Sequence, residues 1–182
     1  GADGVRREFT YDAAGNLASL TGGQTQQEYT YDPLNRLIQR QSGEYRQTYT
    51  YDPLGRLLSG ADLNDPSDPA DDIRSQFEYD NVGNLIKEIQ GERVVKKDFD
   101  TRGQKTALLY PSGEEVKQLY DPAGWLTNIQ VNGQSVSQYE YALLGFAQQE
   151  TLGNGITKNL NYDNLMQLID EEYKKAGLTP PK

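Results

Sequence analysis

A seven-residue motif recurs along the chain, and this repetition limits the possible folds more than any other feature. Its consensus is Tyr-Asp-x-x-Gly-x-Leu, and successive copies begin at residues 11, 31, 51, 79, 99, 120, 141 and 162. The spacings between copies are 20, 20, 28, 20, 21, 21 and 21 residues. Eight copies at a near-constant period indicate a repeat architecture, in which each unit is stabilised chiefly by its neighbours.

The centre of the motif predicts a tight turn. In the third copy, Asp52 suits the first position of a type I turn, the following Pro fixes φ, and Gly55 accepts a positive φ. Such a turn closes a hairpin that has a three-residue loop and a bulge. We expect the same at Gly124, and Asn35 tolerates this backbone in the second copy. Met166 does not suit it, so the eighth copy is expected to lack the turn.

This hairpin register places an aromatic–aliphatic pair on one face of the sheet. Tyr31 faces Leu37 across the turn, and Asp32 faces Arg36 on the other side. The strand that enters each turn alternates, as in Tyr29-Thr-Tyr31, which puts the aromatic rings on one face. The predicted structural repeat positions are therefore Tyr11, Asp12, Tyr31, Asp32, Tyr51, Asp52, Gly55, Tyr79, Asp80, Gly83, Asp100, Tyr120, Asp121 and Gly124.

Two strands and two turns per repeat predict an all-β fold, an antiparallel meander of repeated β-hairpins. The return turns are marked by Gly-rich pairs and by Asn132-Gly133, which is the strongest hairpin signal in the chain. We expect about 14 short strands in one twisted and curved sheet. A chain of 182 residues is also long enough for a modest core.

Two segments depart from the pattern, and they set the domain boundaries. Residues 1–163 are assigned to the repeat array, with an acidic insertion at 60–72 that we interpret as an exposed loop. A cation site there is the alternative, although the spacing lacks the Gly and terminal Glu of an EF-hand. Residues 164–182 are assigned to a short amphipathic helix, near 164–176, and a Pro-containing tail. The helix is interpreted as a cap over the end of the sheet, with partner binding as the alternative.

Composition excludes several kinds of chemistry. The chain contains no His and no Cys, which excludes Ser-His-Asp triads, Cys nucleophiles, disulfides and imidazole or thiolate zinc sites. Its net charge of −9 argues against nucleic acid or an anionic membrane as a partner. No run of 18 apolar residues is present, so no segment is expected to insert in a membrane.

The recurring Asp residues are the only candidates for catalysis, and a structural role explains them better. Paired carboxylates can hydrolyse glycosides, but a turn-forming Asp accounts for one copy in every repeat. We therefore expect no enzyme, no metal and no cofactor. The aromatic rows form either the packed face of the sheet or a stacking platform for sugars. Trp125 occupies the motif position of Arg36 and is expected to be exposed on the outer face.

The motif array resembles the YD-repeat, or Rhs-repeat, family over about residues 5–170. Tyr110-Pro-Ser-Gly-Glu-Glu-Val116 and Leu152-Gly-Asn-Gly-Ile156 add to the resemblance. Members include bacterial Rhs polymorphic toxins, wall-associated YD proteins, toxin-complex C subunits and teneurins. The resemblance implies a sheet that spirals into a hollow shell, often around a toxin domain. The family's core segment and aspartyl self-cleavage site are not found in this sequence, which begins at Gly1 and is interpreted as an isolated shell fragment.

Two classes of function remain open. The first is a non-catalytic structural scaffold, a shell segment that encloses a toxin or belongs to a cell-surface protein. The alternative is an adhesion module that binds carbohydrate or protein on its Tyr-rich face. The expected partners are neighbouring YD repeats of a parent protein, an enclosed toxin cargo or a surface glycan, and further copies through the sheet edges. The expected location is extracellular, either secreted or at the cell surface.

Overall fold

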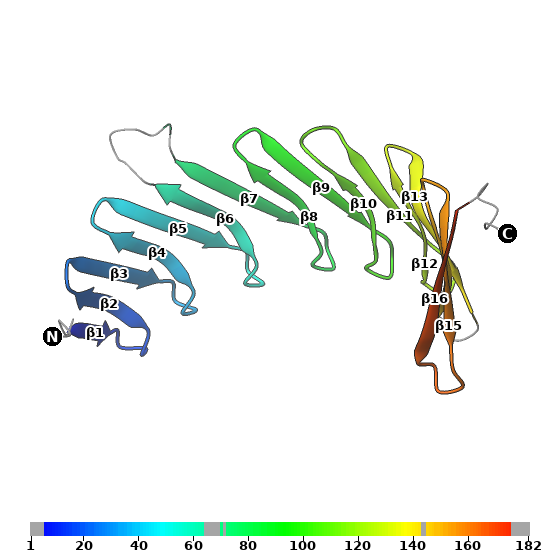
Figure 1. Cartoon of the computed structure of the whole chain (residues 1–182). Helices are drawn as coiled ribbons and strands as arrows, with labels where there is room; N and C mark the ends of the chain where they lie inside the picture. The colour runs from blue at the N-terminus through cyan, green and yellow to red at the C-terminus, as the bar shows by residue number, and fades with distance from the viewer. Residues whose placement is uncertain (1–5, 64–69, 71, 143–144, 176–182) are drawn as a thin grey trace. The chain divides into compact units, whose positions relative to one another are not determined.

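The chain forms one antiparallel sheet of 16 strands in a computed structural model that describes residues 6–63, 70, 72–142 and 145–175. The strands follow one another in the sheet in the order of the sequence (Figure 1). The predicted all-β meander of hairpins is therefore confirmed. The expectation of about 14 strands was too low, because the eighth motif also closes a hairpin and so adds a pair of strands.

The strands are short, as a hairpin repeat of about 20 residues requires. They are β1 (Arg7–Tyr11), β2 (Leu17–Gly22), β3 (Thr25–Tyr31), β4 (Leu37–Ser42), β5 (Tyr45–Tyr51), β6 (Leu57–Leu63), β7 (Ile73–Tyr79), β8 (Leu85–Gln90), β9 (Arg93–Phe99), β10 (Lys105–Leu109), β11 (Glu115–Tyr120), β12 (Leu126–Val131), β13 (Gln134–Tyr141), β14 (Ala147–Leu152), β15 (Ile156–Tyr162) and β16 (Leu168–Lys175).

Contacts divide the chain into two units, Gly1–Val94 and Val95–Lys182. The first unit contains the first four motifs, and the second contains the last four. Each unit consists of consecutive hairpins of the same design.

Every motif closes its hairpin with the same two backbone hydrogen bonds. In the third motif, the Asp52 N–H donates to the Arg56 carbonyl at 2.9 Å, and the Gly55 N–H donates to the Asp52 carbonyl at 3.0 Å. Gly55 has a φ of 85°, in the left-handed region that this turn requires. The register shifts just before each motif Tyr, as at Thr30/Tyr31, which is the bulge of a three-residue hairpin loop. The same bond pair starts at Asp12, Asp32, Asp80, Asp100, Tyr110, Asp121, Ala142 and Asp163.

The return turns at the opposite ends of the strands are mostly shorter. Asn132 and Gly133 have φ values of 50° and 80°, which identifies the type I′ turn that this pair favours. The three other two-residue loops have a positive φ at their first residue only, as expected for type II′ turns: Gly23, Gly43 and Gly91.

The prediction of a C-terminal helix over 164–176 is wrong. Leu168–Lys175 form β16, which pairs with β15 from Ile156↔Lys175 to Tyr162↔Leu168. Met166 adopts a φ of 61°, and its N–H donates to the Asp163 carbonyl at 3.0 Å. A left-handed non-Gly residue costs roughly 1–2 kcal/mol. We attribute the turn to the long ladder with β15, which outweighs this local cost. The tail at 176–182 lies outside the described residues.

No hydrophobic side chain among the described residues is buried, so the modest core expected from the length is not found there. The two faces nevertheless differ. In β3, Tyr29 and Tyr31 are partly covered, whereas Glu28 and Thr30 are exposed. Because the described strands form a single layer without a buried hydrophobic side chain, cohesion there has to come from contacts between adjacent strands and turns.

The acidic insertion falls only partly on described residues. Residues 60–63 of the assigned insertion belong to β6, where 60–63 pair with β5 and 60–62 pair with β7. Residues 64–69 and 71 lie outside the described part of the chain. The exposed-loop and cation-site interpretations therefore concern mainly residues outside the described part, although Ala70 is exposed and Asp72 pairs with Arg74 at 2.8 Å.

Candidate functional site

The Asp side chain of each motif is occupied by its own turn. Oδ1 of Asp52 accepts hydrogen bonds from the backbone N–H groups of Leu54 and Arg56, both at 2.9 Å. Its Oδ2 accepts a hydrogen bond from Nε of Arg56 at 2.6 Å. An N–H four residues further on donates to the carboxylate in all the Asp-containing motifs, which are those of Asp12, Asp32, Asp52, Asp80, Asp100, Asp121 and Asp163.

In four motifs, those of Asp12, Asp32, Asp52 and Asp80, these donors lower the pKa of the carboxylate. The backbone N–H of Arg36 is the main cause that lowers the pKa of Asp32 below its ordinary value. Burial raises the pKa of Asp52, but the backbone N–H and guanidinium of Arg56 together outweigh it and lower this pKa. A general acid or base works best with a pKa near the operating pH. The pKa values of Asp32 and Asp52 are shifted downward, away from neutral pH. The geometry therefore favours a turn role for these Asp residues.

The motif Tyr reaches back to the preceding motif. The Tyr51 hydroxyl donates to the Leu37 carbonyl at 2.8 Å, while its backbone pairs with Leu57 of its own motif. Each acceptor is the last residue of the preceding motif. This hydrogen bond, which we call the Tyr link, occurs at Tyr31→Leu17, Tyr51→Leu37, Tyr79→Leu57, Tyr120→Lys105, Tyr141→Leu126 and Tyr162→Ala147, with lengths of 2.7–3.0 Å.

Burial supports the Tyr links. It raises the pKa of the hydroxyls of Tyr31, Tyr120 and Tyr141, with smaller contributions from nearby acidic groups. The hydroxyls therefore remain protonated donors at neutral pH. The sequence predicted the Tyr–Leu pairs within each motif. It did not predict the link between motifs, because the acceptor is a backbone carbonyl.

The sixth residue of the motif reaches forward in the first unit. Cζ of Arg36 lies 4.9 Å from the centroid of the Tyr51 ring, and Nη1 of Arg36 donates to the Asp52 carbonyl at 2.9 Å. Arg56 repeats both contacts one motif later, at 4.7 Å from the Tyr79 ring and 3.2 Å from the Asp80 carbonyl. We call the contact of the sixth motif residue with the next motif Tyr the forward link. In its Arg form it combines a cation–π interaction with a hydrogen bond.

Aromatic residues make the forward link in the second unit. Trp125 and Tyr141 have ring centroids 5.3 Å apart, and Phe146 and Tyr162 have centroids 5.4 Å apart. A Cβ added to Gly145 would lie 2.8 Å from the Trp125 ring. The expectation that Trp125 is exposed on the outer face is therefore wrong, because its ring packs against the next repeat. Its shared motif position with Arg36 and Arg56 was the available signal.

Other motifs are joined by polar side chains. Nη2 of Arg102 donates to the Pro122 carbonyl at 2.6 Å, and Nε2 of Gln104 donates to the Gly124 carbonyl at 2.7 Å. In the first unit, Nδ2 of Asn16 donates to Oδ1 of Asn35 at 2.9 Å. Within each unit, consecutive repeats are thus connected by side chains from both directions.

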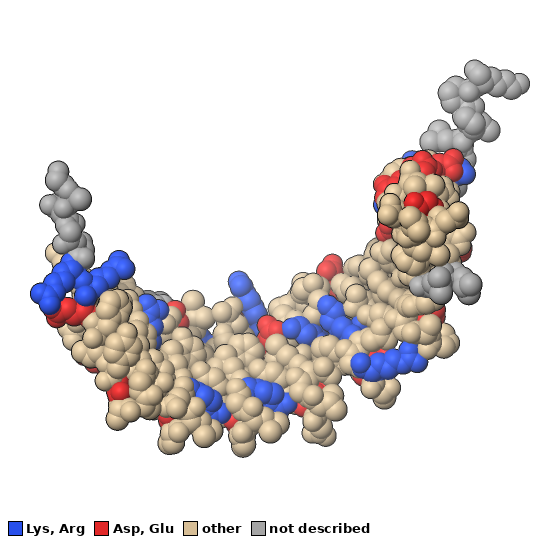
Figure 2. All heavy atoms as spheres, turned by 90° about the horizontal axis from the view of Figure 1, so that it is seen from below, with Lys and Arg blue, Asp and Glu red and all other residues tan. Residues whose placement is uncertain are grey.

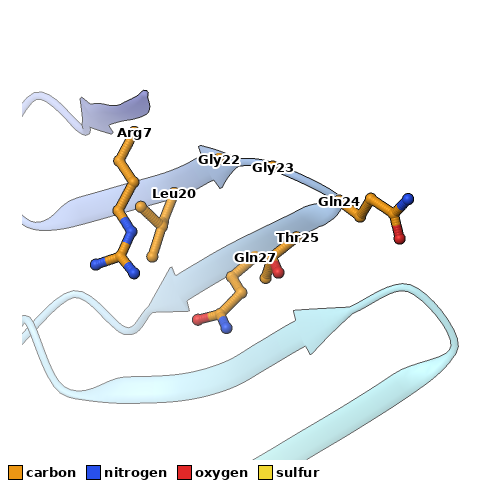
Figure 3. Close-up of a pocket in the computed structure, with 7 residues that line it drawn as sticks. All are labelled: Arg7, Leu20, Gly22, Gly23, Gln24, Thr25 and Gln27. Atoms are coloured by element: carbon orange, nitrogen blue, oxygen red, sulfur yellow. The ribbon is translucent and has the colours of Figure 1, made fainter. Parts of the chain in front are cut away.

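The surface offers little that resembles a reactive site. One hollow of about 500 Å³ lies at the ends of β1–β3, and it is open and lined by Arg, Leu, Thr, Gln and Gly but by no carboxylate (Figure 3). On the face in Figure 2, most of the surface is uncharged and the charged residues of both signs are scattered along it. No cluster of acidic residues suited to a metal ion occurs in the described ranges. Within the same ranges, no helix has the length and apolar character to cross a membrane.

The repeats match a known family. The RHS Repeat family matches residues 11–47, which span the first two motifs and the strand after them. The recognition of the YD-repeat, or Rhs-repeat, family is confirmed. No curated protein matches the chain in sequence.

Solved structures of toxin complexes share the fold. The structure of TcdB2-TccC3-TEV is 15% identical and matches with a TM-score of 0.52 over 94% of this chain and 11% of that chain. TcdB2-TccC3 without its hypervariable C-terminal region gives 15% identity and a TM-score of 0.52, over 93% and 11%. The Photorhabdus luminescens Tc holotoxin pore gives 15% and 0.50, over 93% and 11%. This YD-repeat chain thus spans about a tenth of the length of those proteins, and at this identity the likeness concerns the fold.

Proposed function

We propose that this chain is a non-catalytic structural scaffold, a wall segment of a YD-repeat shell. The observation that carries the proposal is the series of Tyr links, which join the motif of one repeat to the motif before it. These contacts use Tyr, which with Asp is the most repeated side chain of the motif, for cohesion. A single-layer sheet held in this way can extend by adding repeats, which suits a wall.

The carboxylates support a scaffold rather than an enzyme. Each motif Asp accepts hydrogen bonds from its own turn, and the pKa values of Asp12, Asp32, Asp52 and Asp80 are lowered. Hydrolysis by a carboxylate pair needs one partner that holds a proton near neutral pH. A lowered pKa opposes that requirement.

The shell proposal also concerns the partners and the location of the chain. Its partners would be neighbouring YD repeats and an enclosed toxin cargo, and its location would be extracellular. The fold that it shares with TcdB2-TccC3 structures and with a Tc holotoxin pore supports this assignment. Adhesion through the Tyr-rich face is the competing function. Against it, six Tyr hydroxyls that a sugar would need as partners already donate to backbone carbonyls.

A test of cohesion separates a scaffold from the alternatives. Arg56→Ala removes the forward link between the third and fourth motifs, and amide hydrogen exchange of the full chain reports local opening. A scaffold of linked neighbours predicts that Arg56→Ala increases amide exchange, relative to the wild type, more in β5–β8 than in β1–β2. Faster exchange confined to the residues beside Arg56 would contradict the proposal.

Binding and turnover assays test the two alternatives, adhesion and catalysis. We expect no glycan on an array to bind the purified chain above background. Glycan binding that disappears in Tyr49→Ala, with circular dichroism unchanged, would instead establish adhesion. Hydrolytic turnover that disappears in Asp52→Asn would establish an enzyme.

A further inference from the structure

Two Asn-Gly pairs occur in the sequence, Asn132-Gly133 and Asn154-Gly155, and in each pair the Asn is exposed at a return turn. Asn before Gly is especially prone to spontaneous deamidation, because Gly has no side chain to hinder its backbone nitrogen. We propose that the folded chain deamidates at Asn154, that the fold protects Asn132, and that the reaction at Asn154 loosens the adjoining end of β14 and β15.

The reaction consumes water and needs no other reagent. The backbone nitrogen of Gly155 loses its proton and attacks Cγ of Asn154, which closes a succinimide ring. The side-chain amide nitrogen takes up a proton and leaves as ammonia. Water then opens the ring: attack at Cγ gives Asp, and attack at the backbone carbonyl carbon gives isoaspartate, in which the main chain runs through the former side chain. The attack on Cγ requires the main chain at the Asn to rotate away from its folded conformation.

Asn132 is held against this rotation by a neighbouring strand. Its N–H donates to the Glu115 carbonyl at 2.8 Å, and its Oδ1 accepts a hydrogen bond from the Glu115 N–H at 2.9 Å. Glu115 is the first residue of β11, so backbone and side chain of Asn132 are both tied to a strand outside its own turn. The φ of 50° belongs to the type I′ turn that joins β12 and β13. Rotation would break both hydrogen bonds and this turn together.

The hydrogen bond of the Asn154 side chain stays within its own loop. Oδ1 of Asn154 accepts a hydrogen bond from the Ile156 N–H, two residues further on, at 3.1 Å. The Gly155 N–H donates to the Leu152 carbonyl at 2.9 Å, and this bond has to open before the nitrogen can attack. Contacts inside one loop open more readily than a pair of bonds to a neighbouring strand. The rotation is therefore less costly at Asn154 than at Asn132.

The loop around Asn154 has little room for the isoaspartate product. A Cβ added to Gly153 would lie 2.8 Å from the Ser135 carbonyl oxygen, so the main chain there lies close against β13. Isoaspartate lengthens the main chain of the loop beside the Thr151↔Thr157 pair. The length of a hairpin loop determines how its two strands fit together. We therefore expect the strand pairs nearest this loop to open more often after the reaction.

Peptide mass spectrometry measures the two rates in one sample. The full chain is incubated in mildly alkaline buffer and cut after Glu, which places the two sites on different peptides because Glu140 and Glu150 lie between them. We expect Asn154 to deamidate several-fold faster than Asn132. The control is the same chain in urea, where both sites should react at similar rates. In Asn154→Gln the longer side chain reacts far more slowly, so product at residue 154 should disappear while the rate at Asn132 stays the same.

Each other result counts against the proposal. A rate at Asn132 equal to or above that at Asn154 in the folded chain would show that Glu115 gives no protection. The same ratio of rates in urea would show that the adjacent residues, not the fold, cause the difference. No product at Asn154 in the folded chain, while the chain in urea reacts, would show that the loop protects both sites.

Hydrogen exchange of the product tests the structural consequence. The deamidated chain carries an additional negative charge, so ion exchange separates it from the parent chain. Amide exchange of the isoaspartate fraction should be faster than in the parent chain around Thr151 and Thr157, and unchanged in β2 and β3. Unchanged exchange around the two Thr residues would overturn the claim that the reaction loosens this end of β14 and β15.

Discussion

The two units of the chain make the forward link with different chemistry. In the first unit, Arg36 and Arg56 lie over the next Tyr ring, and each is held by an Asp of its own turn at 2.7 and 2.6 Å. In the second unit, Trp125 and Phe146 pack on the next Tyr with no charge involved. In these four motifs the sixth position supplies a planar group that lies over the next Tyr ring, whereas Asn16 and Gln104 at the same position donate hydrogen bonds to the next motif instead.

This difference teaches how the repeat tolerates variation. The turn and the Tyr link are backbone-centred, so they persist whichever side chain fills the sixth position. The Arg version depends on an ionised Asp and is screened by salt. The aromatic version depends on contact between apolar ring surfaces, so salt does not screen it. The two units should therefore respond differently to the same perturbations.

The largest expected effect comes from Gly145→Ala in the second unit. Gly145 has a φ of 85°, and an added Cβ would lie 2.8 Å from the Trp125 ring. We expect a loss of about 2–3 kcal/mol, from left-handed strain and from displacement of the ring. Urea unfolding of the full chain measures it.

Gly55→Ala in the first unit is the matched control for this change. Gly55 also has a φ of 85°, but an added Cβ would meet no atom within 4 Å. Only the strain of roughly 1–2 kcal/mol should remain. Equal losses at the two glycines would show that the Trp125 link contributes no stability.

The second prediction compares Trp125→Ala with Arg56→Ala in low and high salt. We expect losses of about 2 kcal/mol for Trp125→Ala and about 1 kcal/mol for Arg56→Ala at low salt. Because ion pairs are screened, 1 M NaCl should reduce the cost of Arg56→Ala and leave that of Trp125→Ala unchanged. Equal salt dependence in urea melts would remove the distinction between the units.

The third prediction concerns acid. The folded-state pKa of Asp52 is lowered from its ordinary value of 3.8, so its contribution is present above that pH and is lost as pH falls through the folded-state value. Asp52→Asn removes this titration. We expect its urea midpoint to lie below that of the wild type at pH 7 and to approach it below pH 3.8. A constant difference between the two proteins from pH 7 to pH 3 would contradict the role of the carboxylate.

The smallest effect is expected from removing one Tyr hydroxyl in either unit. Tyr51→Phe and Tyr141→Phe each delete one hydrogen bond, of 2.8 and 2.7 Å, and keep the ring. Each change should cost about 0.5–1.5 kcal/mol. The Tyr link is common to both units, so the two losses in urea melts should be similar. A loss in one unit only would show that the link is not a general feature.

The sequence predicted the local parts of this structure well. The Asp52 turn, the left-handed Gly55 and the Tyr51–Leu57 pair follow from residues that are close in the chain. The prediction failed at Met166, where the spacing of nearby apolar residues indicated a helix. Pairing with β15 decided that segment, and a partner strand is not visible in local spacing.

The links between repeats could not be predicted for a related reason. The acceptor of the Tyr51 hydroxyl is the backbone carbonyl of Leu37. Because every residue has such a carbonyl, the identity of residue 37 does not indicate the hydrogen bond. Its place depends on the register between β4 and β5, which turn chemistry alone does not give. The role of Trp125 was accessible in principle, because Arg56 stands at the same motif position.

A double-mutant cycle between Trp125 and Tyr141 tests most directly the claim that neighbouring repeats hold each other together. The cycle uses Trp125→Ala, Tyr141→Ala and the double variant, and it compares their free energies of unfolding in urea. A control cycle pairs Trp125 with Tyr162, whose ring packs against Phe146. We predict a coupling of about 0.5–1.5 kcal/mol for Trp125–Tyr141 and about zero for the control. Coupling near zero in both cycles, or equal coupling in both, would contradict the account.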